Sequence, residues 1–491
     1  MFSRVLLRSL EKIFKTTGCT KRNYSPKISF NKVTDSTVKS LRDLLGEKKV
    51  FTEEAVREQH SHDESYHTSA MPDVVVFPDS VEYVSKVVAF CNTNRIPVVP
   101  YGTGTGLEGG VNAVQGGVSI NMKNMDKVVE VNGLDFDVTV QPGITREALN
   151  SYCRDTGMWF PIDPGADCSV CGMCATSASG TNAVKYGTMR ENVLNLEVVL
   201  PDGRIIHTSG KGRRAKKTSA GFNMTNLFVG SEGTLGIITQ ATVKMHGIPE
   251  KTVVAYCHFK KIEDAVDTVI QIVSSGIPVA KCEFLDDSAI KAFNAYSDYH
   301  MPVAHSLFME VHGPEASVHH LFNEITTLCI SNNGYGFTGA EQAEDRARLW
   351  KARHEMLYAV NALVPGSKSF VTDVCVPVTK LTEIIVKTKQ WIDKANIIGP
   401  IVGHVGDGNF HVFFPIKPGD TTALNTVLDI SKQMVLLSLA LNGTCTGEHG
   451  IGLGKRKYLL QEVGEDGVSA MQQVKQALDP NGIMNPGKIF Y

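Results

Sequence analysis

PYGTGTGLEGG, at residues 100–110, says more about the architecture than any other segment of the chain. It follows an apolar segment, PVVPYG (97–102), that we expect to be a strand. Its glycines and threonines allow several backbone N–H groups to point at one anion, as in a nest for a pyrophosphate. It does not open an amphipathic helix, as the Rossmann fingerprint requires, and it lacks the Gly-Lys-Ser/Thr ending of a P-loop. Taken alone, it fits a glycine-rich surface turn equally well.

Two further glycine-rich segments favour a cofactor site. DPGADCSVCGMCATSASGTNAVKYG (163–187) is rich in small side chains and hydroxyls, which let the backbone run close to a flat ring system. GSEGTLGIIT (230–239) then ends the same region with a glycine turn and a strand. In order and spacing, the three segments closely resemble the FAD-binding domain shared by vanillyl-alcohol oxidase and the p-cresol methylhydroxylase (PCMH-type) flavoproteins. The resemblance covers roughly residues 68–247.

This resemblance implies that FAD lies between two α+β subdomains. The pyrophosphate is expected on residues 102–106, the isoalloxazine and its neighbours near residues 163–169 and 176–179, and the adenosine side near residues 232–238. Because the first loop has Thr103 and Thr105 and no histidine, non-covalent FAD is expected. The cofactor contacts expected from the resemblance are Pro100, Tyr101, Gly102, Thr103, Gly104, Thr105, Gly106, Asp163, Pro164, Gly165, Ala166, Asp167, Cys168, Ser169, Thr176, Ser177, Ala178, Ser179, Glu232, Gly233, Thr234, Leu235, Gly236, Ile237, Ile238 and Asn485.

The length and composition of the chain restrict the class of protein that it can be. At 491 residues, two or three domains are expected, and a formal net charge of −2 argues against a nucleic-acid footprint. No apolar run reaches the roughly 18 residues that span a bilayer. The patterns predict an α+β fold: a helical segment at 34–67, a PCMH-type FAD-binding domain at 68–247, an α+β substrate (cap) domain at 248–445, and a C-terminal segment with a helix, 446–491, that returns to the flavin and completes the active site.

The first 33 residues differ in composition from the rest. Eight basic residues accompany a single acid, Glu11, and the apolar residues recur at helical intervals. This pattern predicts a mitochondrial presequence, whose cleavage point the sequence leaves open. The alternative is a solvated basic arm. The expected location is therefore the mitochondrion, either in the matrix or associated with the inner membrane.

Eleven cysteines in a chain of intracellular character argue against a disulfide framework. Cys168, Cys171 and Cys174 have a C-x-x-C-x-x-C spacing that can hold an iron–sulfur cluster or zinc. No fourth cysteine lies nearby in sequence, and the surrounding residues are nearly all small. The alternative is that these thiols are compact fillers, which is the interpretation we prefer.

GHVGDGNFHVFF (403–414) places His404 and His411 on either side of a glycine-rich core. The glycines, Asp407 and Asn409 favour a turn over a helix, so we expect a tight turn that leads into a strand with the two rings converging. Farther on, GTCTGEHGIGLGK contributes Glu448 and His449. Two imidazoles and one carboxylate are typical of catalytic zinc or manganese. We therefore expect His404, His411 and Glu448 to bind a divalent metal, Zn or Mn. The alternative is a capped turn with incidental polar residues.

GHVGDGNFH, GEHGIG and NPGKI together resemble the C-terminal signature of FAD-linked D-2-hydroxyacid dehydrogenases, which act on D-lactate, glycolate or D-2-hydroxyglutarate. With the cationic N-terminus, the chain is most similar to the mitochondrial, cytochrome-c-linked branch. The resemblance implies oxidation of D-lactate or a related D-2-hydroxy acid to the 2-oxo acid, with hydride transfer to flavin N5 and cytochrome c as electron acceptor. His449 is the expected catalytic base, because an imidazole titrates near neutral pH. Arg353 is the expected clamp for the substrate carboxylate; the alternative is a surface helix arginine.

Two positions bear on the substrate. Hydroxyglutarate enzymes of this kind carry an Asn two residues after the second histidine and a Lys shortly before the aspartate of the strand that matches FVTDV. Here these positions hold Phe413 and Val371. An apolar wall would leave a distal carboxylate desolvated and unpaired. We therefore expect a monocarboxylic substrate, with D-2-hydroxyglutarate or glycolate as the alternatives. Trp350 is expected either in this wall or in a core. Two further rivals are an electron-transfer flavoprotein that carries an iron–sulfur cluster and a lipid-ether synthase on the same flavin domain.

Overall fold

Residues 29–297, 300–340 and 342–491 are described by the computed structural model, so the predicted presequence falls almost entirely outside the described residues. Hydroxyl side chains cap the first two long helices of the N-terminal part. Helix α2 (Asp35–Leu45) begins at Thr34, whose hydroxyl accepts from the backbone of Thr37, and α4 (Val81–Thr93) begins at Ser80. Between them lie η1 (Glu47–Lys49) and α3 (Glu54–Gln59). The segment predicted to be helical up to residue 67 is irregular after α3.

The first FAD-domain sheet has the order β1-β2-β4-β3, formed by β1 (Val50–Phe51), β2 (Val74–Val76), β4 (Val118–Asn121) and β3 (Val98–Tyr101). β2, β4 and β3 are parallel, and β1 is antiparallel to β2. The apolar faces of α2 and α4 pack on this sheet through residues such as Leu41 and Val84. β3 ends where the glycine-rich loop begins, which places that loop at the carboxyl edge of the parallel strands.

The second FAD-domain sheet is antiparallel, in the order β5-β6-β10-β8-β9. Its strands are β5 (Val128–Asn132), β6 (Asp137–Val140), β10 (Ile237–Lys244), β8 (Val193–Val199) and β9 (Ile205–His207). Short helices interrupt this strand-rich region: α5 (Arg146–Cys153), η2 (Arg154–Thr156), α6 (Val170–Thr176), α7 (Ala183–Tyr186), α8 (Met189–Asn192) and α9 (Met224–Phe228). A two-stranded ribbon pairs β7 (Met158–Trp159) with β11 (His246–Gly247).

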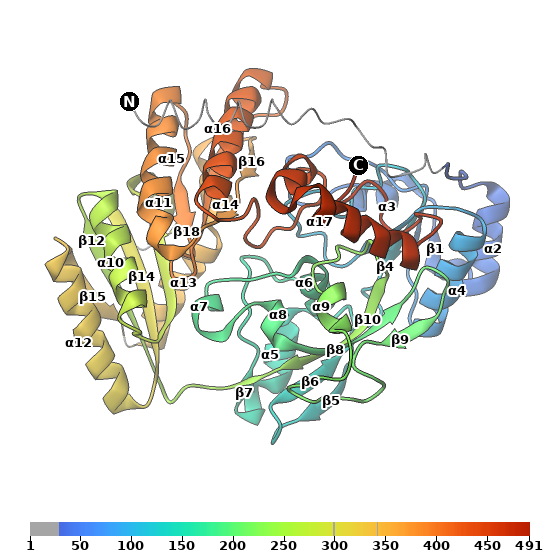
Figure 1. The fold of residues 1–491 in the computed structure, drawn as a ribbon, viewed down its shortest axis with the longest axis horizontal. Helices are drawn as coiled ribbons and strands as arrows, with labels where there is room; N and C mark the ends of the chain where they lie inside the picture. The colour runs from blue at the N-terminus through green and yellow to red at the C-terminus, as the bar shows by residue number, and fades with distance from the viewer. Residues whose placement is uncertain (1–28, 298–299, 341) are drawn as a thin grey trace.

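A large sheet forms the other lobe (Figure 1), in the order β15-β12-β14-β13-β18-β19-β16, with β17 paired to β19. Its strands are β12 (Lys251–Phe259), β13 (Val279–Leu285), β14 (His305–Gly313), β15 (Tyr335–Ala340), β16 (Lys368–Val371), β17 (Val374–Cys375), β18 (Ile401–Gly403) and β19 (Asn409–Ile416). Its helices are α10 (Ile262–Ser274), α11 (Asp287–Tyr296), α12 (Glu315–Ser331), α13 (Ala343–His354), α14 (Met356–Leu363), η3 (Val378–Lys380), α15 (Leu381–Ala395) and α16 (Thr421–Ala440).

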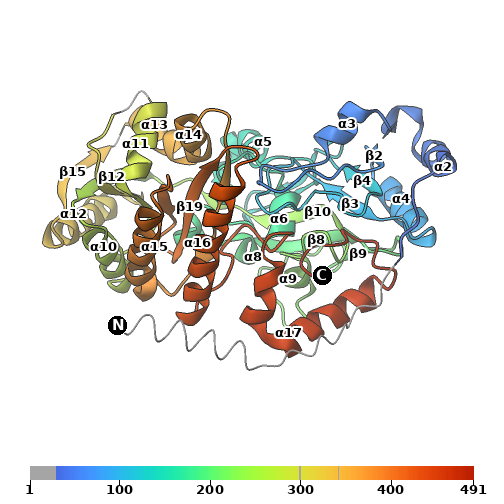
Figure 2. The ribbon, with the colours of Figure 1, turned by 90° about the horizontal axis from the view of Figure 1, so that it is seen from above.

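Helices cover both faces of this sheet. α10, α12, α15 and α16 pack on one face and α11, α13 and α14 on the other, as the view from above shows (Figure 2), and each face has its own buried core. The segment AEDRARLWKARHEMLYAVNAL (343–363), whose sequence pattern predicts one helical stretch, forms two helices, because the helix breaks at Glu355. The histidine turn is confirmed as a turn that leads into a strand, β19, which begins at Asn409.

The C-terminal segment crosses from the large lobe to the FAD-binding lobe. Helix α17 (Arg456–Leu478) bends at Gly464 and lies over the FAD-binding domain (Figure 1). After it, Ile483 and Met484 are buried in the core of the first sheet, and Asn485 donates its backbone N–H to Val98 O at 2.8 Å. The C-terminal segment thus joins the large lobe to the FAD-binding lobe. Within the described residues, no helix is both long and apolar enough to cross a bilayer.

Candidate active site

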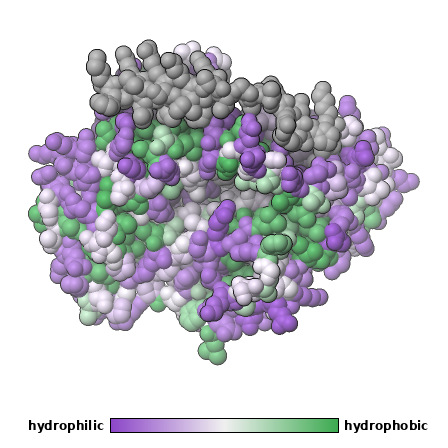
Figure 3. Space-filling model, viewed as in Figure 1, coloured by the Kyte–Doolittle hydropathy of each residue, from purple (hydrophilic) through white to green (hydrophobic). Residues whose placement is uncertain are grey.

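A large cavity opens where the FAD-binding domain, the large lobe and the C-terminal segment meet. It holds about 1940 Å3 of space, its open mouth included. On the face shown in Figure 3, the surface recedes between the two lobes.

Most of the residues predicted to contact the cofactor line this cavity: Pro100, Tyr101, Gly102, Thr103, Gly104, Thr105, Gly106, Asp163, Pro164, Gly165, Ala166, Cys168, Ser169, Thr176, Ala178, Ser179, Glu232, Gly233, Gly236, Ile237, Ile238 and Asn485. Four others do not line it. The carboxylate of Asp167 accepts the backbone N–H of Glu147, and the hydroxyl of Ser177 contacts Arg190. Thr234 donates to Ser231 O, and Leu235 is buried in the core of the second sheet.

The first loop lies close to the start of α6. A Cβ on Gly102 would lie 2.6 Å from Ser169 Oγ, so a side chain at this position would have to displace that hydroxyl. Ser169 Oγ is itself buried, lines the cavity, and has no hydrogen-bond partner among the described residues. An unpaired buried hydroxyl is costly unless a ligand completes it. An anionic ligand, such as the phosphate of a dinucleotide, would supply the missing partner for this hydroxyl.

His404, His411 and Glu448 converge at one end of the same cavity. Glu448 Oε1 lies 3.1 Å from His404 Nε2 and 3.1 Å from His411 Nε2. The turn after β18 carries His404, β19 carries His411, and the glycine-rich turn after α16 carries Glu448. Glu448 Oε2 is buried without a partner among the described residues.

The hydrogen bonds of the two histidines identify which nitrogen is free. His404 Nδ1 lies 2.6 Å from Glu283 Oε1, and His411 Nδ1 lies 3.0 Å from Thr372 O. Each Nδ1 faces an acceptor and therefore carries the ring proton in a neutral imidazole, which leaves both Nε2 lone pairs directed at Glu448. Three electron-pair donors that face one another are stabilised by a cation between them, so the donor set fits a divalent metal.

The electrostatics of the site agree with this requirement. Burial alone would raise the pKa of Glu448, but the imidazoles of His404 and His411 hold it well below its usual range. Burial alone would lower the pKa of His404, but the carboxylates of Glu283 and Glu448 outweigh it and raise it well above its usual value. Both directions show a site that favours positive charge between these groups.

Arg353 points into this site and is not a surface residue. It lies on α13, is buried, lines the cavity, and donates its Nε–H to Glu283 Oε2 at 2.8 Å. Glu283, on β13, is fully buried and connects Arg353 to His404. One carboxylate therefore orients both the expected substrate clamp and a metal-ligand candidate.

His449 stacks on His411, with ring centroids 4.8 Å apart and planes at 11°. Its Nε2 lies 4.0 Å from Glu448 Oε1, and its Nδ1 is buried without a partner among the described residues. Burial lowers the pKa of His449 to about 4, so the ring is neutral at physiological pH and can accept a proton.

Asp373, His411 and His449 form a second group whose candidate ligand atoms lie within 4.8 Å of one another. Asp373, however, already accepts hydrogen bonds from the backbone N–H groups of Glu448 and His449 and from Lys455. A metal there would have to displace these donors. The group of His404, His411 and Glu448 is therefore the better candidate.

The cysteine cluster does not assemble a site. Cys171 and Cys174 lie on α6 and are buried in the core of the second sheet, while Cys168 contacts the hydroxyl of Thr105 at 3.1 Å. Among the described residues, the groups with metal-ligating geometry do not include these thiols. This agrees with their interpretation as compact fillers.

An apolar wall stands beside the metal-ligand candidates. Phe413 shares a face of β19 with His411 and pairs directly with Val371 on β16, and both apolar side chains line the cavity. Trp350 is absent from the residues that line it. Its indole N–H donates to Glu310 Oε2, and its ring is buried in the core between the sheet and α11, α13 and α14.

Sequence reasoning missed the carboxylates that support the site. Glu283 stands inside VAKCEFL, a strand whose residues are all buried, and Asp373 stands inside FVTDV. A charged residue within an otherwise apolar strand is the available signal, because such a charge needs a partner. The partners, Arg353 and Lys455, are distant in sequence and come from other elements.

Comparisons with known proteins agree with the geometry. Residues 72–209 match the family described as "FAD binding domain", and residues 248–489 match the family described as "FAD linked oxidases, C-terminal domain". The chain is 54% identical to "Probable D-lactate dehydrogenase, mitochondrial" of Danio rerio, over 93% of this chain and 92% of that protein. It is 43% identical to "D-lactate dehydrogenase [cytochrome], mitochondrial" of Arabidopsis thaliana, over 87% of this chain and 75% of that protein.

Solved structures confirm the predicted fold. p-Cresol methylhydroxylase with substrate bound superposes with a TM-score of 0.76 at 16% identity, over 94% of this chain and 98% of that chain. An alkyldihydroxyacetonephosphate synthase superposes with a TM-score of 0.73 at 20% identity, over 94% of this chain and 87% of that chain. At these identities the likeness concerns the fold alone.

Proposed function

The chain belongs to the family of FAD-linked oxidases, and from that premise we propose that it oxidises D-lactate, and other D-2-hydroxy monocarboxylic acids, to the 2-oxo acid. The proposal includes non-covalent FAD, one divalent metal, Zn or Mn, cytochrome c as electron acceptor, and a mitochondrial location. One observation carries it. The three donor atoms of His404, His411 and Glu448 converge in the same cavity that the cofactor loops line, with Arg353 and His449 beside them.

Two bound groups supply chemistry that the side chains lack. FAD, when bound, supplies an acceptor for the hydride from C2 of the substrate. A divalent cation, when bound, supplies a Lewis acid that stabilises a developing alkoxide.

The side chains of the chain bind and orient the substrate. Arg353, held by Glu283 through its Nε and Nη2, keeps further guanidinium N–H groups for the substrate carboxylate. His449 Nε2 lies on the Glu448 side of its ring and is neutral, so it takes the proton of the 2-hydroxyl group. His449 is a weak base because it is buried. A weak base suffices here, because a neighbouring cation would lower the pKa of the substrate hydroxyl.

The apolar wall selects the substrate. A distal carboxylate against Phe413 and Val371 would lose its hydration without gaining a partner, at a cost of several kcal/mol. A methyl group in the same place has no such hydration to lose, so its burial does not carry this cost. D-Lactate is therefore favoured over D-2-hydroxyglutarate.

The test is anaerobic mixing of the FAD-loaded enzyme with a panel of D- and L-2-hydroxy acids while the flavin absorbance is followed. We expect rapid bleaching by D-lactate and little by L-lactate or D-2-hydroxyglutarate. Equal bleaching by D-lactate and D-2-hydroxyglutarate would overturn the apolar-wall argument. Absorption beyond the two flavin bands would instead support an iron–sulfur cluster.

The role of His449 has its own test. His449→Ala should retain flavin and metal and lose flavin reduction by D-lactate. Undiminished reduction in this variant would remove His449 from the mechanism. His404→Ala should lower the metal content while FAD stays bound.

A further inference from the structure

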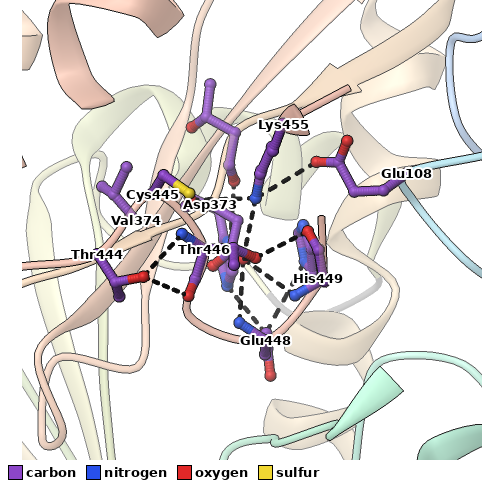
Figure 4. Close-up of polar contacts among 12 residues, drawn as sticks. Glu108, Asp373, Val374, Thr444, Cys445, Thr446, Glu448, His449 and Lys455 are labelled. Carbon is purple, nitrogen blue, oxygen red and sulfur yellow. Dashed lines mark hydrogen bonds and ion pairs between the residues drawn. The ribbon is translucent and has the colours of Figure 1, made fainter. Parts of the chain in front are cut away.

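A buried group of three charged side chains lies next to the turn that carries Glu448 and His449 (Figure 4). Lys455 Nζ lies 3.2 Å from Asp373 Oδ2 and 3.3 Å from Glu108 Oε1. The side chains of Lys455 and Glu108 are each 8% exposed, and that of Asp373 is fully buried. Burial alone would lower the pKa of Lys455, but the two carboxylates outweigh it and raise the pKa, so the lysine is a cation.

Asp373 holds the turn that carries the expected ligand and the expected base. Its Oδ2 accepts the backbone N–H groups of Glu448 and His449, each at 3.0 Å, and the hydroxyl of Thr446 at 2.8 Å. Its Oδ1 accepts from Asn409 Nδ2 at 2.7 Å, which ties the same carboxylate to the start of β19. The position of Glu448 relative to His411 is therefore set by one anion, which lies next to the cation Lys455.

Glu108 belongs to the glycine-rich loop 100–110 that is expected to bind the cofactor. Its backbone carbonyl accepts the N–H of Leu453 at 2.8 Å. The chain packs so closely here that a Cβ on Gly452 or Gly454 would clash with Glu108. Glu232, in another cofactor segment, accepts the N–H groups of Ile451 and Gly452. The turn that carries Glu448 is thus attached on one side to Asp373 and on the other to cofactor segments.

We propose that Lys455 is a positioning residue that, through Asp373, places Glu448 and His449 for metal binding and base function, and that, through Glu108, links this turn to the cofactor loop. The proposal rests on the proposed function, because it assumes that a metal binds at His404, His411 and Glu448. Without its cation, Asp373 is a buried unpaired anion, and its turn rearranges to admit water or another donor. The link through Glu108 couples the metal site to the cofactor loop. Because such a coupling is reciprocal, a change that weakens metal binding also weakens the retention of FAD, and the converse holds.

The experiment uses the FAD-loaded enzyme and two variants of the lysine, Lys455→Met and Lys455→Arg. Metal affinity is measured by competition with a chromophoric chelator, using Mn²⁺ and Zn²⁺ in separate titrations. We expect Lys455→Met to bind metal about 10- to 100-fold more weakly, as for other residues that orient metal ligands. Lys455→Arg keeps the charge and should recover most of the affinity. We also expect the kcat for D-lactate to fall in Lys455→Met more than KM changes, because the base moves with the turn.

The link to the cofactor loop is tested with Glu108→Gln, which leaves Asp373 paired with Lys455. Release of FAD through a filter is compared before and after the metal is chelated. In the wild type we expect chelation to accelerate the release of FAD several-fold, and in Glu108→Gln we expect a smaller effect. If Lys455→Met does not fold, Lys455→Gln, which also removes the charge but keeps a polar side chain, replaces it in the metal titrations, and Glu108→Gln still tests the link to the loop.

Arg214→Met is the matched control, because it removes a cation from a buried aspartate, Asp137, in the second sheet, away from the cavity. It should lower the melting temperature and leave the metal affinity unchanged. Wild-type enzyme that binds no metal would contradict the proposed function. Wild-type enzyme that binds metal, with Lys455→Met binding it equally well, would overturn the role of Lys455 alone. An equal effect of chelation on wild type and Glu108→Gln would overturn the link to the loop.

Discussion

Replacing Glu283 by Gln tests whether His404 is oriented as a metal ligand. In the wild type, Glu283 accepts from Arg353 Nε at 2.8 Å through one oxygen and contacts His404 Nδ1 at 2.6 Å through the other. Gln has one acceptor oxygen and one donor NH2 group. If the oxygen stays with Arg353, the NH2 group faces His404 Nδ1. The ring must then change tautomer and place its proton on Nε2, where the metal would bind.

The size of the effect follows from two contributions. Loss of an orienting partner behind a ligating histidine typically weakens metal binding about 10- to 100-fold. Removing one member of a buried ion pair also destabilises the fold by roughly 3–5 kcal/mol, because the charge of Arg353 is left without its partner. We therefore expect Glu283→Gln to bind Mn²⁺ or Zn²⁺ at least tenfold more weakly and to melt at a lower temperature. The assay is competition with a chromophoric chelator on enzyme whose flavin spectrum shows full FAD.

Glu310→Gln is the control for this prediction. Glu310 is also buried, lies on the neighbouring strand β14, and is bonded to His312 Nε2 and Trp350 Nε1, none of which is a metal-ligand candidate. It makes the same chemical change and should lower stability without changing the metal affinity. If Glu283→Gln binds metal as tightly as the wild type, the tautomer argument for His404 is refuted. Equal loss of affinity in both variants would refute it too, since the effect would then come from general destabilisation.

Three further predictions concern the substrate and the pH dependence. Arg353→Lys should lower kcat/KM for D-lactate about 10- to 100-fold, because Lys cannot form the bidentate pair; a steady-state assay with an artificial acceptor that shows no change would exclude the clamp. Val371→Lys should lower the preference for D-lactate over D-2-hydroxyglutarate, measured as the ratio of the two kcat/KM values, whereas Val371→Thr should leave the preference in place. Asp286 is fully buried at the start of α11, and burial raises its pKa to about 6 from an ordinary 3.8. Because the pKa of Asp286 is higher in the folded than in the unfolded state, the protonated side chain stabilises the fold. This stabilisation is fully present below about pH 4 and is lost as the pH rises through about 6. The side chain of Asp286→Asn stays neutral at every pH. Its free energy of unfolding should therefore rise relative to that of the wild type by up to about 3 kcal/mol between about pH 4 and pH 6. If thermal melting at several pH values shows a constant difference in stability between variant and wild type, the assigned pKa is contradicted.

The local parts of the fold could be predicted because their signals lie within a few residues. The local pattern offers Thr34 or Asp35 as the cap of the first helix and Asp79 or Ser80 as the cap of the second, and the structure uses Thr34 and Ser80. The glycines between His404 and His411 make a turn before a strand. The break of one expected helix into α13 and α14 at Glu355 was not predicted, because no Gly or Pro marks it in ARHEMLYAV. There the packing of α14 against α11 and the sheet overrides the local pattern.

The site was predictable in its ligand candidates and not in its supporting groups. His404, His411, Glu448 and His449 stand in short glycine-rich motifs, and chemistry alone suggests that they share a function. Glu283, by contrast, stands in a buried strand, and its role depends on the register that brings β13 beside β18, where Phe284 pairs with Gly403. That register comes from long-range packing and has no signature within one segment. Arg353 was expected to meet the substrate directly, and its partner Glu283 became visible only in three dimensions.

Anomalous X-ray diffraction from crystals of the FAD-loaded enzyme soaked with Mn²⁺ tests the convergence of metal and cofactor most directly. The expected result is a single strong peak about 2.0–2.2 Å from His404 Nε2, His411 Nε2 and a carboxylate oxygen of Glu448, with the flavin ring in the same cavity. A fully loaded crystal with no peak at these three side chains, or with its flavin bound away from them, would contradict the account.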